Sequence, residues 1–133
     1  MTDYRRLGRS GLTVSTVGLG CNNLGRANTP TESQEGTDAV VHAAIDAGVT
    51  LFDVADVYGK IPGLSEEMLG RALHGRRDDV LIATKFGMDM HGVNGKDFGA
   101  RGSRRYIRQA VDASLRRLRT DWIDLYQFHT PDP

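Results

Sequence analysis

The sequence feature that most constrains the fold is a regular alternation of short apolar runs with longer amphipathic segments. Four runs have the length and the β-branched or aromatic content of strands: "STVGLG" (15–20), "TLFDVA" (50–55), "DVLIATK" (79–85) and "WIDLYQFH" (122–129). A segment with helical spacing of apolar residues separates each run from the next. Because parallel strands need a long crossover connection, usually a helix, this order predicts an α/β fold with a parallel sheet covered by helices.

Three helices are predicted between these strands. Their expected limits are as follows: the first begins at Thr31 or Thr37 and stops before Gly48, the second covers 65–75 with Ser65 as its N-cap, and the third runs from the N-cap Ser103 to about Arg119. Apolar positions at helical spacing predict their buried faces: Ala39, Val40, Ala43, Ala44 and Ala47 in the first, Met68, Leu69, Ala72 and Leu73 in the second, and Ile107, Val111, Leu115 and Leu118 in the third.

Two further segments complete the expected layout. The N-terminal stretch "YRRLGRSGLTVS" alternates around Arg9–Gly11, which predicts a β-hairpin. Residues 86–102 hold five glycines and have no periodicity, so they are expected to form a long loop. Compact domains keep such loops mostly for a functional reason, and this one is expected to contribute to substrate specificity.

The composition excludes several classes of protein. Lys plus Arg and Asp plus Glu number 17 each, so no net charge favours nucleic acid or an anionic membrane. With 133 residues and one cysteine, Cys21, the chain can form no internal disulfide, which fits a reducing compartment. No apolar run approaches the roughly 20 residues of a membrane-spanning helix, and the N-terminus lacks the apolar region of a signal peptide. We therefore expect a cytoplasmic protein.

Four polar residues follow or close the predicted strands at the edge where parallel α/β folds bind ligands. Asp53 and Tyr58 follow the second strand, Lys85 closes the third and His129 closes the fourth. A tyrosine is a weak acid–base catalyst at neutral pH, and a nearby ammonium favours its phenolate form. Lys85 can act in this way on Tyr58, with Asp53 holding the charge of Lys85 and His129 orienting a substrate oxygen. Such a set suits protonation of a carbonyl oxygen as a hydride reaches its carbon.

Each of these residues also has an ordinary structural interpretation. Asp53 can cap a turn, Tyr58 can be a half-buried aromatic, and Lys85 and His129 can be solvated strand ends. Taken singly, each residue favours that interpretation. Their occurrence together at the corresponding ends of consecutive strands favours a functional site.

The motif "LFDVADVYG", with Lys85 closing "VLIATK" and His129 closing "DLYQFH", resembles the aldo-keto reductase superfamily. The opening "YRRLGRSGLTVSTVGLG" is similar to the N-terminal hairpin and first barrel strand of that family. The resemblance implies a TIM (β/α)8 barrel that reduces aldehydes or ketones with a nicotinamide cofactor, usually NADPH. It also implies a catalytic tetrad of Asp53, Tyr58 as proton donor, Lys85 and His129.

The resemblance extends over one half of such a barrel, which needs about 250 residues. Residues 1–133 are therefore expected to form a single incomplete domain: the hairpin, strands 1–4 and helices 1–3. Asn22 and Asn23 lie where the family's first loop approaches the nicotinamide, and Asp53 is a further cofactor-binding candidate. Most of the NADPH site is expected beyond Pro133. We expect self-association or complementation by the missing half-barrel, since open strand edges invite pairing.

Other functions and sites have less support. A non-catalytic protein on the same scaffold, either a truncated product or a regulatory subunit, is the main alternative to the reductase. His91 lies near Asp89 and Asp97, but their spacing fits no zinc pattern, and we expect no metal site. The arginines of the third helix are expected to form a solvated outer face and not a nucleic-acid surface: Arg104, Arg105, Arg108, Arg116, Arg117 and Arg119.

Overall fold

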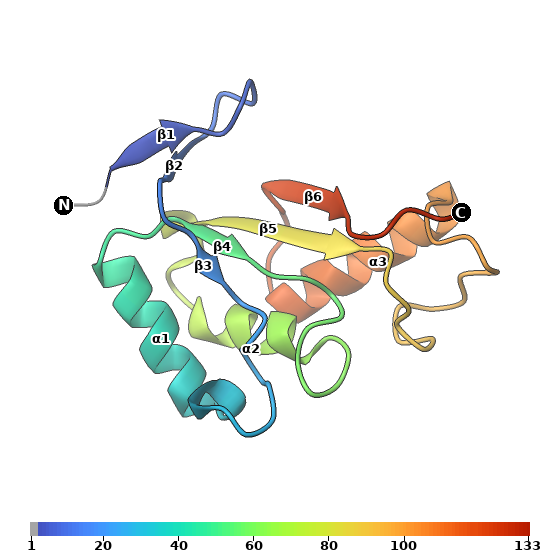
Figure 1. The fold of residues 1–133 in the computed structure, drawn as a ribbon, viewed down its shortest axis with the longest axis horizontal. Helices are drawn as coiled ribbons and strands as arrows, with labels where there is room; N and C mark the ends of the chain where they lie inside the picture. Colours follow the sequence, from blue (N-terminus) through green and yellow to red (C-terminus); the bar gives the residue numbers. More distant parts are fainter. Residues whose placement is uncertain (1–2) are drawn as a thin grey trace.

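The computed structural model describes residues 3–133, and its centre is a parallel sheet in the order β3-β4-β5-β6 (Figure 1). The strands are β3 (Leu19–Gly20), β4 (Leu51–Asp53), β5 (Leu81–Phe86) and β6 (Leu125–Phe128). Each strand pairs in parallel with the next one along the chain. This confirms the predicted fold class, a partial barrel.

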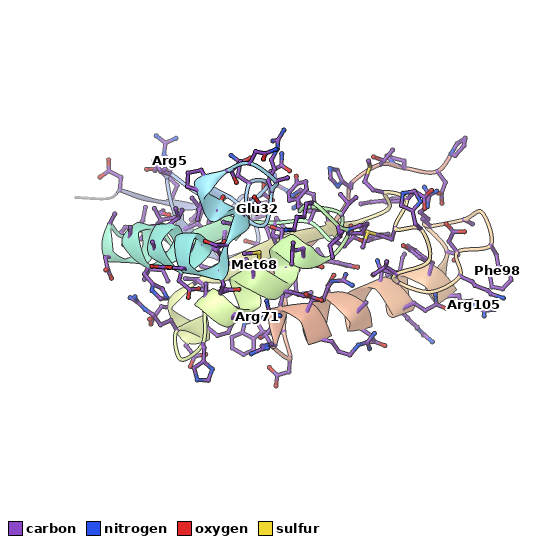
Figure 2. The ribbon with its side chains drawn as sticks, turned by 90° about the horizontal axis from the view of Figure 1, so that it is seen from below. Arg5, Glu32, Met68, Arg71, Phe98 and Arg105 are labelled. Carbon is purple, nitrogen blue, oxygen red and sulfur yellow. The ribbon has the colours of Figure 1, made fainter. Side chains whose placement is uncertain are left out.

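Three helices cover one face of the sheet: α1 (Gln34–Asp46), α2 (Leu64–Ala72) and α3 (Arg104–Leu118) (Figure 1). Seen from the helical side, they lie next to one another, with Met68 and Arg71 of α2 between α1 and α3 (Figure 2). Among the described residues, no helix or strand covers the opposite face of the sheet. No helix within residues 3–133 has the length and apolarity needed to cross a membrane.

The N-terminal hairpin forms as predicted, from the antiparallel strands β1 (Tyr4–Arg6) and β2 (Thr13–Ser15). The backbone N–H of Ser15 donates to Thr50 Oγ1 at 2.8 Å, and the N–H of Thr50 donates to Ser15 Oγ at 2.9 Å. These bonds attach the hairpin to the beginning of β4. The hairpin therefore lies away from the carboxyl ends of the strands.

The predicted strand 15–20 is shorter than expected, because Ser15 ends the hairpin and only Leu19–Gly20 pairs with β4. β4 and β6 are shorter than predicted at both ends, whereas β5 begins two residues later than predicted and extends one residue further, to Phe86. Two short 3-10 helices, η1 (Pro30–Glu32) and η2 (Arg77–Asp79), complete the elements. Residues 87–103 form the predicted long loop before α3.

The predicted helix starts were partly wrong. The N-cap of α1 is Ser33, whose hydroxyl accepts from the Gly36 N–H, and neither Thr31 nor Thr37 begins the helix. The N-cap of α2 is Gly63, at φ 92°, and Ser65 lies inside the helix. Only the Ser103 cap of α3 is confirmed, with its hydroxyl accepting from the Tyr106 N–H at 3.2 Å.

The predicted buried face was right for α2, wrong for α1, in which four of the five expected positions are exposed, and wrong in part for α3. All four expected positions of α2 are buried. In α1, Thr37 and Val41 face the core, and Thr37 is accommodated because its hydroxyl donates to the Thr31 carbonyl at 2.9 Å. The buried positions of α3 are shifted by one residue from most of those expected: Tyr106, Ala110, Ala113, Ser114 and Leu118.

Candidate active site

The carboxyl ends of three neighbouring strands bring the four predicted polar residues to one rim. Asp53 is the last residue of β4, Lys85 is the penultimate residue of β5, and His129 directly follows β6. Tyr58 lies in the loop that connects β4 to α2. The parallel register aligns these strand ends, because Asp53 pairs with Ala83 and Lys85 with Gln127.

Lys85 is the centre of the group. Its Nζ donates to Asp53 Oδ1 at 2.7 Å and to the Val54 carbonyl at 2.7 Å, and lies 3.4 Å from Tyr58 Oη. The Lys85 side chain is 12% exposed, whereas that of Asp53 is 50% exposed. One carboxylate oxygen and one backbone carbonyl oxygen therefore hold the ammonium of Lys85 beside the phenol of Tyr58.

His129 completes the group through a contact with Tyr58. The two rings meet edge to face, with centroids 5.9 Å apart. Burial, reinforced by the charge of Lys85, lowers the pKa of His129 below its ordinary value of 6.5. The imidazole is therefore neutral at neutral pH and has one N–H to donate. Its Nδ1 is buried and has no partner among the described residues.

The loop that carries Tyr58 is held tightly. The Tyr58 N–H donates to the Ala55 carbonyl, and the Tyr58 carbonyl accepts from the Ser65 N–H at 3.0 Å. Gly59 follows at φ 111°, and a Cβ there would lie 2.9 Å from Leu64 Cβ. Only glycine fits this turn without strain, which explains the Tyr-Gly pair in the sequence.

The first loop lies beside Asp53. The Cys21 N–H donates to the Asp53 carbonyl at 2.8 Å, and the Cys21 carbonyl accepts from Ser65 Oγ at 2.7 Å. This second bond explains why Ser65 does not cap α2. Asn22 and Asn23 are exposed. The Asn23 side chain accepts from Arg26, whereas that of Asn22 makes no hydrogen bond within residues 3–133.

Cys21 is a buried core residue and not a reactive thiol. It is fully buried, and burial, with a smaller contribution from Asp53, raises its pKa to about 12. The residues of the weak metal pattern are also not brought together. His91 contacts Asp89, but Asp97 pairs with Arg101, and residues 3–133 contain no group of three or more potential His, Cys, Asp or Glu ligands.

The sequence analysis missed a buried polar network behind the Tyr58 loop. Arg117 was assigned to the solvated face of α3, which is wrong, because its Nε donates to Glu66 Oε1 at 2.8 Å and its side chain is 9% exposed. Arg117 also donates to Asn94 Oδ1, and Asn94 donates to Asp56 Oδ2 at 2.9 Å. The sequence signal that could have indicated this ion pair is a glutamate in the first turn of α2, Glu66, together with an arginine in the last turn of α3, Arg117.

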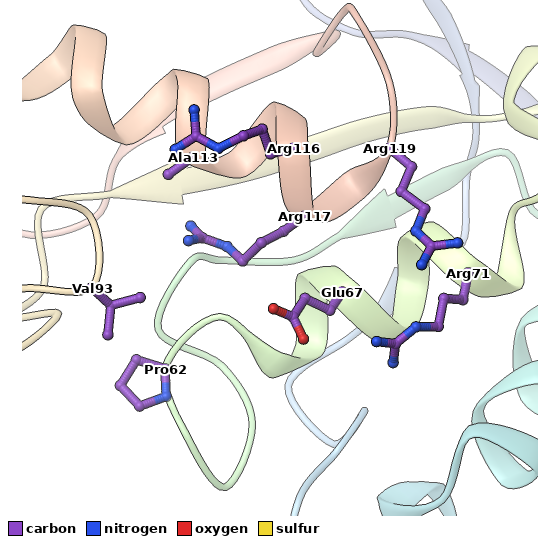
Figure 3. A pocket seen from close by; sticks show the side chains of 8 residues that line it. All are labelled: Pro62, Glu67, Arg71, Val93, Ala113, Arg116, Arg117 and Arg119. Atoms are coloured by element: carbon purple, nitrogen blue, oxygen red, sulfur yellow. The ribbon is translucent and has the colours of Figure 1, made fainter.

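On the helical side, away from the rim, a cavity of about 420 Å³ opens between α2 and α3 (Figure 3). Its charged lining comes from the two helices and the residue after α3: Glu67, Arg71, Arg116, Arg117 and Arg119. Arg117 reaches from this cavity into the buried network. The cavity does not include any of the four rim residues.

The rim geometry suits acid–base chemistry on a small polar group. A phenol, an ammonium and a neutral imidazole lie together at the carboxyl ends of parallel strands, where barrel enzymes place their active sites. The ammonium and the carboxylate are bonded to each other, so the charge of Lys85 is kept in a partly buried position. The fold and the position of these residues define a partial TIM barrel with a candidate active site at the carboxyl ends of its strands.

The chain belongs to the Aldo/keto reductase family, whose sequence model matches residues 16–133. Two relatives come from Bacillus subtilis. The uncharacterized oxidoreductase YqkF is 42% identical over 130 residues, which cover 94% of this chain and 38% of that protein. The aldo-keto reductase YhdN is 38% identical and is matched over 98% of this chain and 39% of its own length.

Solved structures agree with this assignment. An aldo-keto reductase from Klebsiella pneumoniae in complex with NADPH superimposes with a TM-score of 0.77 at 28% identity, covering 100% of this chain and 41% of that one. The holo form of AKR11C1 from Bacillus halodurans gives a TM-score of 0.74 at 34% identity, over 96% of this chain and 40% of that one. This chain therefore spans about two fifths of the length of these relatives.

Proposed function

We propose that this chain carries the catalytic tetrad of a nicotinamide-dependent reductase that converts small aldehydes or ketones to alcohols. Tyr58 donates its phenolic proton to the carbonyl oxygen. Lys85, held by Asp53, stabilises the phenolate that remains. The observation that carries the proposal is the position of Lys85 Nζ, which is bonded to Asp53 and lies 3.4 Å from Tyr58 Oη.

His129 is proposed to orient the substrate. Because its imidazole is neutral, it can donate one hydrogen bond to the carbonyl oxygen that Tyr58 protonates. The edge-to-face contact holds the two rings close together, so both side chains can reach the same carbonyl oxygen. The long loop 87–103 stands beside this rim and is proposed to contribute to substrate choice.

The rim also fits the nicotinamide end of a cofactor, which would supply the hydride. Asn22 and Asn23 offer exposed amide side chains directly after Cys21, whose N–H bonds the Asp53 carbonyl, and the carboxylate of Asp53 is half exposed. Asn22 is free of side-chain partners within residues 3–133, so it can bond a carboxamide. NADPH is the proposed cofactor because the Klebsiella pneumoniae structure contains it. A cytoplasmic location is proposed because Cys21 is a free cysteine, which fits a reducing compartment.

A non-catalytic role on the same scaffold is the second candidate. NADPH binding separates the two candidates, because a reductase must bind the cofactor and a purely structural subunit need not.

The test is Tyr58→Phe in the natural protein that carries these residues, assayed for NADPH-dependent carbonyl reduction. Loss of a general acid should lower kcat by about 10²–10⁴-fold while NADPH binding stays nearly unchanged. Tyr4→Phe in the exposed hairpin is the matched control and should have no effect. Undiminished reduction by the Tyr58→Phe variant would end the assignment.

A further inference from the structure

Asp56 is a fully buried carboxyl group two residues before Tyr58. Its Oδ2 accepts from Asn94 Nδ2 at 2.9 Å, so it joins the Tyr58 loop to the long loop 87–103. Its backbone joins two further parts of the site. The Asp56 N–H donates to the Lys85 carbonyl at 3.2 Å, and the Asp56 carbonyl accepts from the Gly63 N–H at 2.7 Å. Asp56 therefore connects the strand that carries Lys85 to both ends of the segment that carries Tyr58.

The charges around Asp56 do not balance if its carboxyl is ionised. Arg117 is the cation that contacts the network, and it is paired with Glu66. Thr84 and Ser114 also donate to Glu66, at 2.8 and 3.1 Å, so Glu66 is the carboxylate that the network is built to hold. The hydrogen bonds that Asp56 receives, from the Asn94 amide and the Val57 backbone, are both uncharged, and Arg117 acts on it only from a distance. A buried carboxylate without a cation is costly, and such a group protonates instead.

The remaining oxygen of Asp56 supports the same conclusion. Asp56 Oδ1 is buried without a partner among the described residues, and so is the hydroxyl of Tyr126 on β6. A buried charge without a partner costs more free energy than a buried neutral group without one, so this unpartnered oxygen favours the protonated acid. The groups that face Asp56 come from each surrounding element: Glu66 from α2, Arg117 and Tyr106 from α3, Asn94 from the long loop and Tyr126 from β6.

We propose that Asp56 is a positioning residue for Tyr58: its side chain, as a neutral carboxylic acid, fastens the Tyr58 loop to the long loop, while its backbone N–H bonds the Lys85 carbonyl. This inference rests on the catalytic role proposed for Tyr58. Ionisation of Asp56 would place a second negative charge beside Glu66 and draw water into the network, which loosens the loop.

The pKa of Asp56 points the same way, since burial, then the charge of Glu66, raise it from 3.8 to about 7. The unfolded chain loses this proton near pH 4 and the folded chain near pH 7. Between these values the folded state alone retains the proton, so stability falls as pH rises. The equilibrium constant for unfolding should therefore rise by about tenfold per pH unit through this window.

The first experiment compares wild type with Asp56→Asn, which has the same shape and no charge, by urea unfolding from pH 4 to pH 8 without substrate or cofactor. The rise in the unfolding constant should be present in wild type and missing in Asp56→Asn. Asp112→Asn, an exposed change on α3, should behave like wild type. An identical pH dependence in wild type and Asp56→Asn would overturn the neutral-acid proposal, whether or not Tyr58 is catalytic.

The second experiment measures kcat and KM for carbonyl reduction in the natural protein. Asp56→Leu cannot hold Asn94, so kcat should fall by about 10²-fold with KM little changed, because a misplaced catalytic group costs rate. Asp56→Asn should restore kcat to within a fewfold of wild type. Equal loss of kcat in both variants, or no loss in Asp56→Leu, would contradict the positioning role.

Discussion

Lys85, near the end of the buried strand β5, contacts Asp53 and Tyr58 through a single ammonium group. Its ammonium is placed by two short hydrogen bonds, to Asp53 Oδ1 and the Val54 carbonyl, both from the neighbouring strand end. Its Nζ also lies 3.4 Å from Tyr58 Oη, to which it can donate a third hydrogen bond. Because the side chain is mostly buried, solvent screens its effect on the phenol only weakly.

Replacing Lys85 by methionine should separate its electrostatic role from its packing. The Lys85→Met chain should fold, since Asp53 is half exposed and can be hydrated. With no ammonium to stabilise the phenolate that forms, kcat should fall. Lys60→Met removes an exposed lysine paired with Glu32 and is the control. An unchanged kcat in the Lys85→Met variant would show that Lys85 does not act on Tyr58.

Cys21 should be inert in the folded protein. It is fully buried with a pKa of about 12, so almost no thiolate exists at pH 8. Iodoacetamide should modify it far more slowly in the folded chain than in urea, as followed by mass spectrometry. Equal labelling rates under the two conditions would show that the first loop opens readily.

At the scale of elements, α2 and α3 approach one another unusually closely. Glu66 of α2 and Arg117 of α3 form a buried ion pair, and Gly70 lies against the end of α3. A Cβ on Gly70 would come within 2.6 Å of the Arg117 carbonyl oxygen and 2.8 Å of Leu118 backbone atoms. This close approach brings the Arg117 guanidinium within reach of Glu66.

Gly70→Ala should therefore destabilise the protein, although alanine is the better helix former. Overpacking costs about 1–3 kcal/mol, more than the gain of up to about 1 kcal/mol in helix propensity. The measurement is the free energy of unfolding in urea. Gly20→Ala is the control, because a Cβ there has open space and should change stability little. A more stable Gly70→Ala variant would mean that the two helices can separate without cost.

At the scale of the whole molecule, the described residues form an open sheet with two unpaired edges, at β3 and at β6. Large apolar side chains are exposed at or near these edges: Val17, Trp122, Leu125 and Phe128. An open edge with exposed apolar side chains favours pairing with another chain. In a closed barrel, further strands would cover these two edges.

Residues 1–133 produced alone should self-associate, and should bind NADPH more weakly than micromolar. Light scattering gives the mass in solution, and a fluorescence titration gives the affinity. Adding the second half of a relative's barrel as a separate chain should reduce the self-association. A compact monomer that binds NADPH at micromolar concentration would contradict both expectations.

The order of strands and helices, the fold class and the family could be inferred from the sequence, because these depend on local patterns. A period of two or 3.6 residues, a capping serine such as Ser103 and a run such as 79–85 are each read within a few neighbours. The four rim residues were also predictable, since each stands at the end of a recognisable strand or just after it. Parallel strands carry such residues to one edge whatever the details of packing.

Contacts between distant residues were decided by the tertiary structure alone. Ser65 was predicted to cap α2, but its hydroxyl donates to the carbonyl of Cys21. Arg117 was predicted to be solvated, but its guanidinium bonds the carboxylate of Glu66. The state of Asp56 depends on that same pairing, because one buried cation serves one of two buried carboxyls. Local periodicity specifies which face of a helix is apolar, but which charges share a low-dielectric interior depends on how the helices pack.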